Sequence, residues 1–414
     1  MKKTTISIVA AAIILISATA ESSLAKGNNN LEKRLKKLEA QIAELSKESE
    51  EIKKSQAKSH SSNANVASIL GKAQIFGRLQ VDANWYDENQ DTDIRRDGID
   101  IARVRIGIKG ELTDNLNYKF ENDFAENASE VKDAFIAYTG FKNSTITFGQ
   151  SKPTFSLEIL ESSNHMAFIQ RASVSDDAVL GRRVGIKADK RGDIWDWRIA
   201  GGVFGEEVGN EARDDDTKYS YTARASVAPI NNAESLLHFG VATSFTSRDR
   251  KTANGTHDSL DQETLIGGEL IARYKLFTLQ SEYIANNTKY DSDAAKSTGE
   301  NANFPGYYVQ ASVFLTGEQR KYSKKAAKLG KIKVASPADK GGLGAIELAA
   351  RFSHLDKNDK SIEEGSSNNY TLGVNWYMNN NVRLMLNYLK SETSYIIEDS
   401  EGYDAVSLRT RIYF

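Results

Sequence analysis

The chain has 414 residues, and its composition combines 27% charged residues with 29 glycines, 17 tyrosines and 16 phenylalanines. This pattern is typical of many short strands that are joined by turns and edged with aromatic side chains. The formal charge of -2 provides no bulk charge for nucleic-acid binding. The absence of cysteine excludes disulfides, thiolate metal sites and cysteine nucleophiles.

The first residues have the features of an export signal. Lys2 and Lys3 precede an apolar run over residues 6–17, and the small-residue pattern at 18–20 predicts a signal peptide of residues 1–20. The segment 23–25 offers an alternative cleavage site after residue 25. No later segment reaches the about 20 consecutive apolar residues that a transmembrane helix needs. A soluble periplasmic protein and an outer-membrane barrel therefore remain as alternatives.

Residues 28–56 have a heptad pattern, formed by Leu31, Leu35, Leu38, Ile42, Leu45 and Ile52. Apolar residues at steps of four and three predict a short coiled coil. The alternative is a single solvated helix, because the segment has fewer than four heptads and a polar Ser49 on the seam. Residues 57–72 are expected to be a linker.

From residue 73 onward the apolar period changes to two. In 78–86, for example, Leu79, Val81 and Ala83 face one side of a predicted strand, and polar residues face the other. The same alternation predicts sixteen strands, at 78–86, 102–109, 116–124, 131–139, 144–150, 182–188, 195–204, 218–227, 236–245, 264–274, 276–284, 307–316, 344–354, 370–378, 382–389 and 406–414. At about 21 residues per strand and connection, this spacing fits an all-β, antiparallel transmembrane barrel over residues 73–414.

Alternation alone does not distinguish a membrane barrel from a soluble sandwich. Three further features favour the barrel: the export signal, aromatic pairs at strand ends such as Tyr307–Tyr308 and Trp376–Tyr377, and the final strand that ends in Phe414. A terminal strand of this kind resembles the insertion signal of bacterial outer-membrane barrels. Phe414 is therefore expected to engage the barrel assembly machinery.

Residues 151–181 interrupt the strand pattern. Pro153 and two acidic clusters argue against a central strand here. A structureless insert of this length in a compact domain indicates a functional loop. We expect it to fold into the barrel and to narrow the lumen.

Several segments together resemble the phosphate-selective porin O/P family. In chain order they are IARVRIGIKGEL, NYKFENDFAE, VKDAFIAYTGFKNSTITFGQSKPTFSLE, FIQRAS, LGRRVGIK, FLTGEQRKYS and GAIELAARFSHLD. The resemblance implies a sixteen-stranded trimeric barrel whose third loop folds into the pore. It also places the solute-facing cations at Lys152, Arg171, Arg103, Arg105 and Arg183.

Acidic residues of the same loop, including Glu158 and Glu161, are expected to temper the positive field of these cations. The strand register places ten arginines on the lumenal face: Arg78, Arg103, Arg105, Arg183, Arg198, Arg224, Arg351, Arg383, Arg409 and Arg411. They form either an anion track or a wetted barrel wall. Arg411 is expected to lie nearer the barrel end and to affect selectivity less than Arg103 and Arg171. The basic segment 320–340 is expected to be a solvated extracellular loop, with contact to anions or lipopolysaccharide as the alternative.

No sequence motif of a metalloprotease, a nucleophile elbow or a phosphate-binding loop is present, and the five histidines are scattered without ligand spacing. We therefore expect no enzyme activity, no cofactor, no metal site and no nucleic-acid partner. The predicted function is a passive outer-membrane channel for small hydrophilic solutes with a mild preference for anions, among them phosphate. The alternative is a structural tether or adhesin that the barrel only anchors. The expected partners are two further copies of the chain, outer-membrane lipid and lipopolysaccharide, with the N-terminal segment in the periplasm.

Overall fold

The computed structural model describes residues 73–88, 97–125, 129–178, 180–205, 219–247, 260–290, 301–359, 362–395 and 400–414. The predicted signal peptide, the heptad segment and the linker lie outside these residues, so they stay predictions. No helix in the described ranges is long and apolar enough to cross a membrane.

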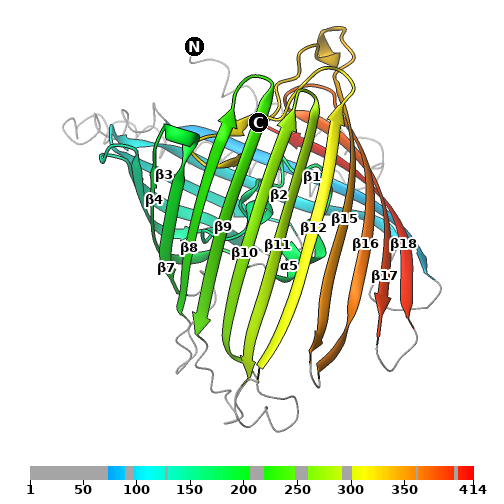
Figure 1. The fold of residues 1–414 in the computed structure, drawn as a ribbon. Coiled ribbons are helices and arrows are strands. Elements are labelled where there is room, and N and C mark those ends of the chain that lie inside the picture. The colour runs from blue at the N-terminus through cyan, green and yellow to red at the C-terminus, as the bar shows by residue number, and fades with distance from the viewer. Residues whose placement is uncertain are drawn as a thin grey trace, which may run out of the picture. The chain divides into compact units, whose positions relative to one another are not determined.

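Sixteen antiparallel strands form a closed barrel in which β1 pairs with β18 (Figure 1). The strands are β1 Gln74–Glu88, β2 Gly98–Thr113, β3 Leu116–Asp123, β4 Glu130–Tyr138, β5 Ser144–Ser151, β6 Arg183–Arg191, β7 Arg198–Phe204, β8 Tyr219–Asn231, β9 Ser235–Ser247, β10 Leu260–Tyr274, β11 Phe277–Tyr290, β12 Asn301–Phe314, β15 Ala345–Asp359, β16 Ile362–Tyr377, β17 Val382–Ser394 and β18 Glu401–Tyr413. Each of the sixteen predicted strands overlaps one of them. The predicted fold class is confirmed for the barrel.

The barrel has apolar side chains on its outer face and polar side chains inside, which is the reverse of a soluble protein. On β18, Leu408 and Ile412 are exposed on the outer face, whereas Arg409 and Arg411 are buried inside. Successive residues of a strand point to opposite faces, so this arrangement follows from the alternation in the sequence. The terminal residue completes the closure, because Gly77 and Phe414 exchange backbone hydrogen bonds of 3.1 Å.

The same alternation corrects one expectation about the aromatic pairs. Tyr308 and Tyr377 are buried rather than part of an outer aromatic edge. Their hydroxyl groups donate to lumenal carboxylates, Tyr308 to Glu282 at 2.8 Å and Tyr377 to Glu347 at 2.9 Å. Adjacent strand residues face opposite sides, so only one member of each pair can face outward.

One wall of the barrel is short. Strands β3 to β7 have between seven and nine residues, whereas the other eleven strands have 13 to 16. At about 3.3 Å per residue and a tilt of about 45°, eight residues rise about 19 Å, and fourteen rise about 33 Å. The apolar band of an outer-membrane barrel is about 25 Å tall. The short wall therefore does not span that band.

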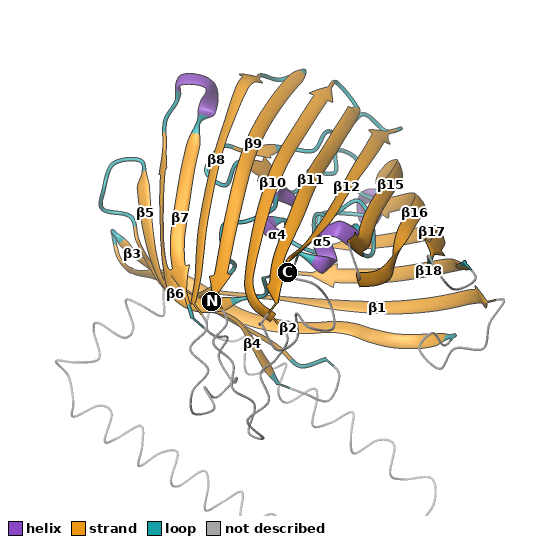
Figure 2. Cartoon of the chain, turned by 60° about the horizontal axis from the view of Figure 1, so that its bottom comes forward, coloured by secondary structure: helices purple, strands orange, loops and turns teal. Residues whose placement is uncertain are grey.

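Two segments fold into the lumen from opposite ends, and Figure 2 shows the two short helices of the first one, α4 and α5, inside the ring of strands. The first joins β5 to β6 over residues 152–182 and contains α4 Leu157–Leu160 and α5 Ser173–Asp177. We call it the constriction loop. The second joins β12 to β15 over residues 315–344 and contains the hairpin of β13 Tyr322–Ser323 and β14 Lys328–Leu329, followed by η2 Ala338–Lys340. We call it the lower insert, where lower means the end of the barrel at which the chain terminates, drawn at the top of Figure 1.

The lower insert corrects in part the expectation of a solvated loop at 320–340, because Lys324, Lys325, Lys331 and Lys333 are exposed, whereas Arg320, Leu329 and Val334 are buried. It lies at the end of the barrel where the chain terminates, since Ala338 N donates to Met378 O and Tyr413 N donates to Asn381 O in the neighbouring turn. The constriction loop starts from the opposite end. Residues of the insert, including Leu329, are buried, and Lys328 Nζ donates to Leu160 O of the constriction loop. Sequence spacing does not reveal such a contact between distant segments.

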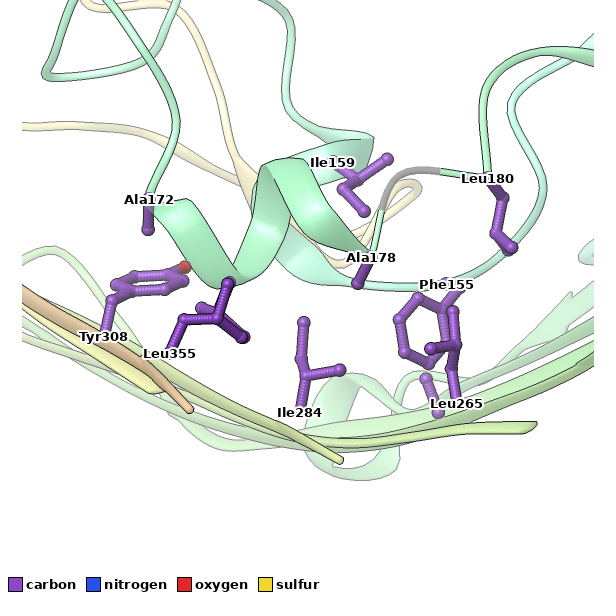
Figure 3. Close-up of a cluster of buried hydrophobic side chains, with 11 residues drawn as sticks. Phe155, Ile159, Ala172, Ala178, Leu180, Leu265, Ile284, Tyr308 and Leu355 are labelled. Atoms are coloured by element: carbon purple, nitrogen blue, oxygen red, sulfur yellow. The ribbon is translucent and has the colours of Figure 1, made fainter. Parts of the chain in front are cut away.

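An apolar core holds the constriction loop against the long wall. Phe155, Ile159 and Val174 of the loop pack on Ile284 and Leu355 of the wall, and all five are buried (Figure 3). Burial of apolar side chains contributes about 1.5–3 kcal/mol for each large one. The predicted inward fold of the loop is thus explained by its own apolar residues.

Gly149, immediately before the constriction loop, has a φ of 112°, and a Cβ there would lie 2.3 Å from Ala134 O. We expect Gly149→Ala to destabilise the barrel by about 1–3 kcal/mol, because L residues rarely adopt this φ and the close atom is backbone. The measurement is the urea midpoint of refolded protein in detergent. Gly268→Ala is the matched control, since its Cβ meets nothing within 4 Å. Equal midpoints for the two variants would contradict the prediction.

Candidate pore constriction

Arginines of the wall strands bind the backbone of the constriction loop. Arg383 Nη1 donates to Met166 O at 2.8 Å, and Arg409 Nη1 donates to Ile169 O at 2.9 Å. Arg411 donates to Asn164 O. Carbonyl groups in an irregular segment need donors once they leave water, and a guanidinium supplies several in one plane. These three arginines are therefore used to hold the loop.

Arg351 makes the most contacts with the loop. It donates to Gln170 O at 3.0 Å and to Arg171 O at 3.2 Å, and it pairs with Glu158 Oε1 at 3.3 Å. Glu158 in turn accepts from Ala172 N at 3.0 Å. One buried ion pair therefore fixes both the start and the middle of the loop.

A wall carboxylate holds the first helical turn of the loop. Glu282 accepts from Leu157 N at 2.6 Å and from Glu158 N at 2.9 Å, which are free donors at the start of α4. Ser156 Oγ donates to the same carboxylate at 3.2 Å. Carboxyl oxygens at a helix start accept from donors that have no partner within the helix.

The ten lumenal arginines therefore do not form one uniform track. Arg351, Arg383, Arg409 and Arg411, on β15, β17 and β18, are used by the loop. Arg411 lies near the end of β18, as expected, but it also contacts the loop, because it donates to Asn164 O. The loop packs against the wall formed by β15, β17 and β18, and an opening remains beside β1 to β4.

That opening is a cavity of about 490 Å³. It has ten basic side chains, Arg78, Arg103, Arg105, Lys119, Lys132, Lys152, Arg171, Arg182, Lys187 and Lys328. Four acidic side chains also line it, Glu121, Glu130, Asp133 and Glu161. The formal excess is six positive charges, so the cavity is a basic region in a chain of net charge -2.

The acidic residues on the strand side are paired. Glu121 lies 2.9 Å from Arg78 and 2.7 Å from Lys119, and Asp133 lies 2.6 Å from Arg182. Carboxylates in such pairs orient the cations and cancel part of their charge. The electrostatic potential that a solute meets in the cavity therefore depends on the basic side chains that are not in ion pairs.

Four of the five predicted site residues, Lys152, Arg171, Arg103 and Arg105, come together on this cavity. Arg183 does not line it. Its guanidinium donates to Leu180 O at 2.8 Å and to Ser220 Oγ at 3.0 Å, behind the end of the loop. Contact of any of the five with a solute stays a prediction.

Lys152 and Arg105 face the cavity but have protein partners. Lys152 Nζ donates to Ile159 O and, at 2.9 Å, to Glu161 O. Burial lowers the pKa of Lys152 well below its usual value, and the charge of Arg171 adds to this effect. Arg105 Nε pairs with Asp123 at 2.6 Å. Lys152 therefore shapes the loop more than it attracts solutes.

Arg103 and Arg171 keep the most available charge. Within the described residues, no carboxylate lies at ion-pair distance from Arg103, whose Nη1 donates to Gln80 Oε1 at 2.7 Å. Arg171 reaches Asp176 only at 3.9 Å, and its side chain is 20% exposed. These two guanidinium groups are the strongest candidates to meet a passing anion.

Sequence reasoning did not select Arg78, Lys119, Arg182, Lys187 or Lys328 for the site, although all five line the cavity. For the first four, the sequence offered a signal, because each lies on or beside a strand in the same half of the barrel as β2, which carries Arg103 and Arg105. Lys328 gave no such signal, because only the inward fold of the lower insert brings it to the loop.

A closed sixteen-stranded barrel with a polar interior and a loop folded into a charged opening defines an outer-membrane porin. The model of the family "Phosphate-selective porin O and P" matches residues 73–414, and the chain belongs to this family.

Two relatives support the assignment. The chain is similar to Porin O of Pseudomonas aeruginosa, with 25% identity over 396 residues, covering 82% of this chain and 87% of that protein. An uncharacterized protein of Caulobacter vibrioides is 27% identical over 337 residues, covering 75% of this chain and 67% of that protein.

Solved structures share the fold at low identity. The anion-selective porin from Comamonas acidovorans matches with a TM-score of 0.51 and 13% identity, over 83% of this chain and 99% of that chain. The trimer form of OmpT of Vibrio cholerae gives 0.53 and 11%, with the same coverage. The outer membrane channel DcaP of Acinetobacter baumannii gives 0.53 and 12%, over 83% and 97%. These likenesses concern the fold.

The division of the arginines is testable by conductance. We expect Arg383→Met to raise the mean single-channel conductance and its noise, because Met166 O loses its donor and Ala167 O keeps only Asn375 Nδ2, which loosens the loop. Arg103→Met is the comparison variant, and we expect it to change ion selectivity with little added noise. Quiet, unchanged conductance in Arg383→Met would show that this arginine does not hold the loop.

Proposed function

We propose that the porin is a passive channel with a modest preference for small anions, and that selection takes place at the cavity beside β1 to β4. The observation that carries this proposal is the excess of six basic side chains on that cavity. Low-dielectric walls around a narrow path focus the potential of such charges, so they act more strongly there than in the wide parts of the lumen.

Guanidinium groups favour phosphate and carboxylate, because their planar donors can bind two oxygens together. The available pair Arg103 and Arg171 fits this class of solute. The family description names phosphate, and the similar Comamonas porin is called anion-selective. Both names support small oxyanions as the solutes of this chain.

The acids on the cavity keep the preference modest. Glu121, Glu130 and Asp133 cancel part of the basic charge through their ion pairs. A chain of this kind attracts anions without holding them, which a diffusion channel needs, since each solute must also leave.

In the proposed orientation, the chain end at Phe414 and the lower insert face the periplasm. An even number of strands brings both ends of the barrel to one side, and bacterial outer-membrane barrels place short turns in the periplasm. The heptad segment before residue 73 would then extend into the periplasm, and Phe414 would meet the barrel assembly machinery.

We further propose that the short wall faces other copies of the chain in a trimer. Strands β3 to β7 rise about 16–21 Å at the usual tilt, less than the about 25 Å apolar band. Their outer face still carries exposed apolar side chains, among them Phe120, Ile136 and Phe148. Contact with protein covers this face, so that the bilayer does not have to become thinner around it.

Selectivity is tested by reversal potentials in a salt gradient across planar bilayers. We expect modest anion preference in the full-length protein. Arg103→Glu and Arg171→Glu should each move the reversal potential towards cations, because each replaces an available positive charge with a negative one. Cation preference in the unchanged protein would overturn the proposal.

The control for this experiment is Lys142→Glu. Lys142 lies exposed in the turn between β4 and β5, outside the cavity. Water and salt screen such a charge within about 8 Å, so this variant should leave the reversal potential nearly unchanged. Equal shifts in all three variants would place the selective region elsewhere.

The short wall is tested with nitroxide labels, since the chain has no native cysteine. Phe148→Cys places a label on the outer face of the short wall, and Val241→Cys places one on the outer face of β9, where Val241 is 63% exposed. Oxygen dissolved in the bilayer should speed the spin relaxation of the label at 241, which faces lipid, but not that of the label at 148, which the neighbouring copy would cover. High oxygen access at both positions would rule out the short wall as the interface.

A further inference from the structure

Glu161 lies where the constriction loop meets the lower insert. It follows α4, is 2% exposed and lines the basic cavity. Its Oε1 atom is buried and has no hydrogen-bond partner. Among the acids of the cavity, Glu121, Glu130 and Asp133 have ion pairs, and within the described residues Glu161 has none.

The cations near Glu161 are used by other groups. Arg320 Nε and Nη2 each lie 2.8 Å from the carboxylate oxygens of Glu347. Lys328 Nζ donates to Leu160 O, and Lys152 Nζ donates to Ile159 O and to the backbone carbonyl of Glu161 itself. The carboxyl group of Glu161 is therefore close to positive charge but receives no direct contact from it.

A buried carboxyl group without a direct partner loses hydration when it ionises, and this disfavours the charged form. Burial, together with the neighbouring Glu158, raises the pKa of Glu161 to about 7 against the attraction of Arg320 and Lys328. The protonated form is then populated just below neutral pH, and the charged form just above it.

We propose that Glu161 is a specificity-determining residue, and that gain and loss of its proton set how strongly the constriction prefers anions. The inference rests on the proposed anion channel. With Glu161 protonated, the cavity carries one positive charge more than with Glu161 ionised. The anion preference should therefore be larger in mildly acidic solution and smaller in mildly basic solution.

The other titratable groups around Glu161 do not reverse this sign. Burial lowers the pKa of Lys328 to about 8, so Lys328 also becomes less positive as the pH rises. Burial and the charge of Arg411 lower the pKa of His165 to about 3, so His165 is neutral across this range. Burial also lowers the pKa of Lys152, so any charge that Lys152 loses as the pH rises acts in the same direction. The remaining charges that face Glu161 are those of Glu158 on α4, Arg171 of the constriction loop and Arg320 of the lower insert.

The experiment measures the anion-to-cation permeability ratio from reversal potentials at about pH 5.5 and about pH 7.5, on either side of the transition. In the unchanged protein we expect the ratio to fall about twofold between the two values, as one charge is added beside the solute path. In Glu161→Gln the ratio should fall much less, because only the smaller loss of charge from Lys328 remains. This amide has nearly the shape of the acid but does not ionise.

Glu130→Gln is the matched control, because it removes a carboxylate from the same cavity at a side chain that is 48% exposed. This variant should keep the pH dependence of the unchanged protein. An equal pH dependence in Glu161→Gln would overturn the role of Glu161 and leave the anion channel intact. A cation-selective or silent protein at both pH values would instead overturn the proposed function. If Glu161→Gln gives little folded barrel, Glu161→Asp provides the second variant, and it should keep a pH-dependent ratio.

Discussion

The arrangement of the lumen depends on one kind of interaction, the hydrogen bond from a wall arginine to a backbone carbonyl of the constriction loop. Arg351, Arg383 and Arg409 supply such bonds at 2.8–3.2 Å. An irregular backbone inside a barrel has few donors of its own, and an unpaired buried carbonyl costs about 1–3 kcal/mol. The wall arginines remove this penalty, and they also decide on which side of the lumen the loop lies. The opening is left beside β1 to β4, next to β18 in the order of the strands.

The loop is held by two further means that act at different places. An apolar core beneath α5 joins it to β10, β11, β12 and β15, and Glu282 binds the start of α4. From the other end of the barrel, Lys328 and Arg320 donate to Leu160 O and His165 O. The two inward segments therefore support each other, and a change in the lower insert can alter the constriction. Some lumenal arginines, such as Arg383 and Arg409, bind the loop, whereas others, such as Arg103, keep a charge that a solute can meet. This division explains how one polar lumen contains both a rigid loop and a selective path.

The barrel was predictable from the sequence because apolar and polar residues alternate in each of its sixteen strands, and this alternation is a local feature of the sequence. The position of the constriction loop was predictable for the same reason, as a long break in that period. The roles of single residues were not. Arg103 and Arg409 look alike on a strand, and only the path of the loop makes one available and the other a donor to Ile169 O. The place of the lower insert was missed because a run of lysines normally marks a solvated loop, whereas here Leu329, Ile332 and Val334 of the insert are buried.

The most direct test of this account asks which side of the lumen is open. Ser163→Cys places a thiol on the basic cavity, and Thr371→Cys places one on β16, where Thr371 is 4% exposed on the wall that the loop covers. A small negatively charged thiol reagent is added while the current through each variant is followed. The account predicts rapid block of the current in Ser163→Cys and little reaction in Thr371→Cys. Equal rates at the two positions would contradict the claim that the wall arginines hold the loop to one side.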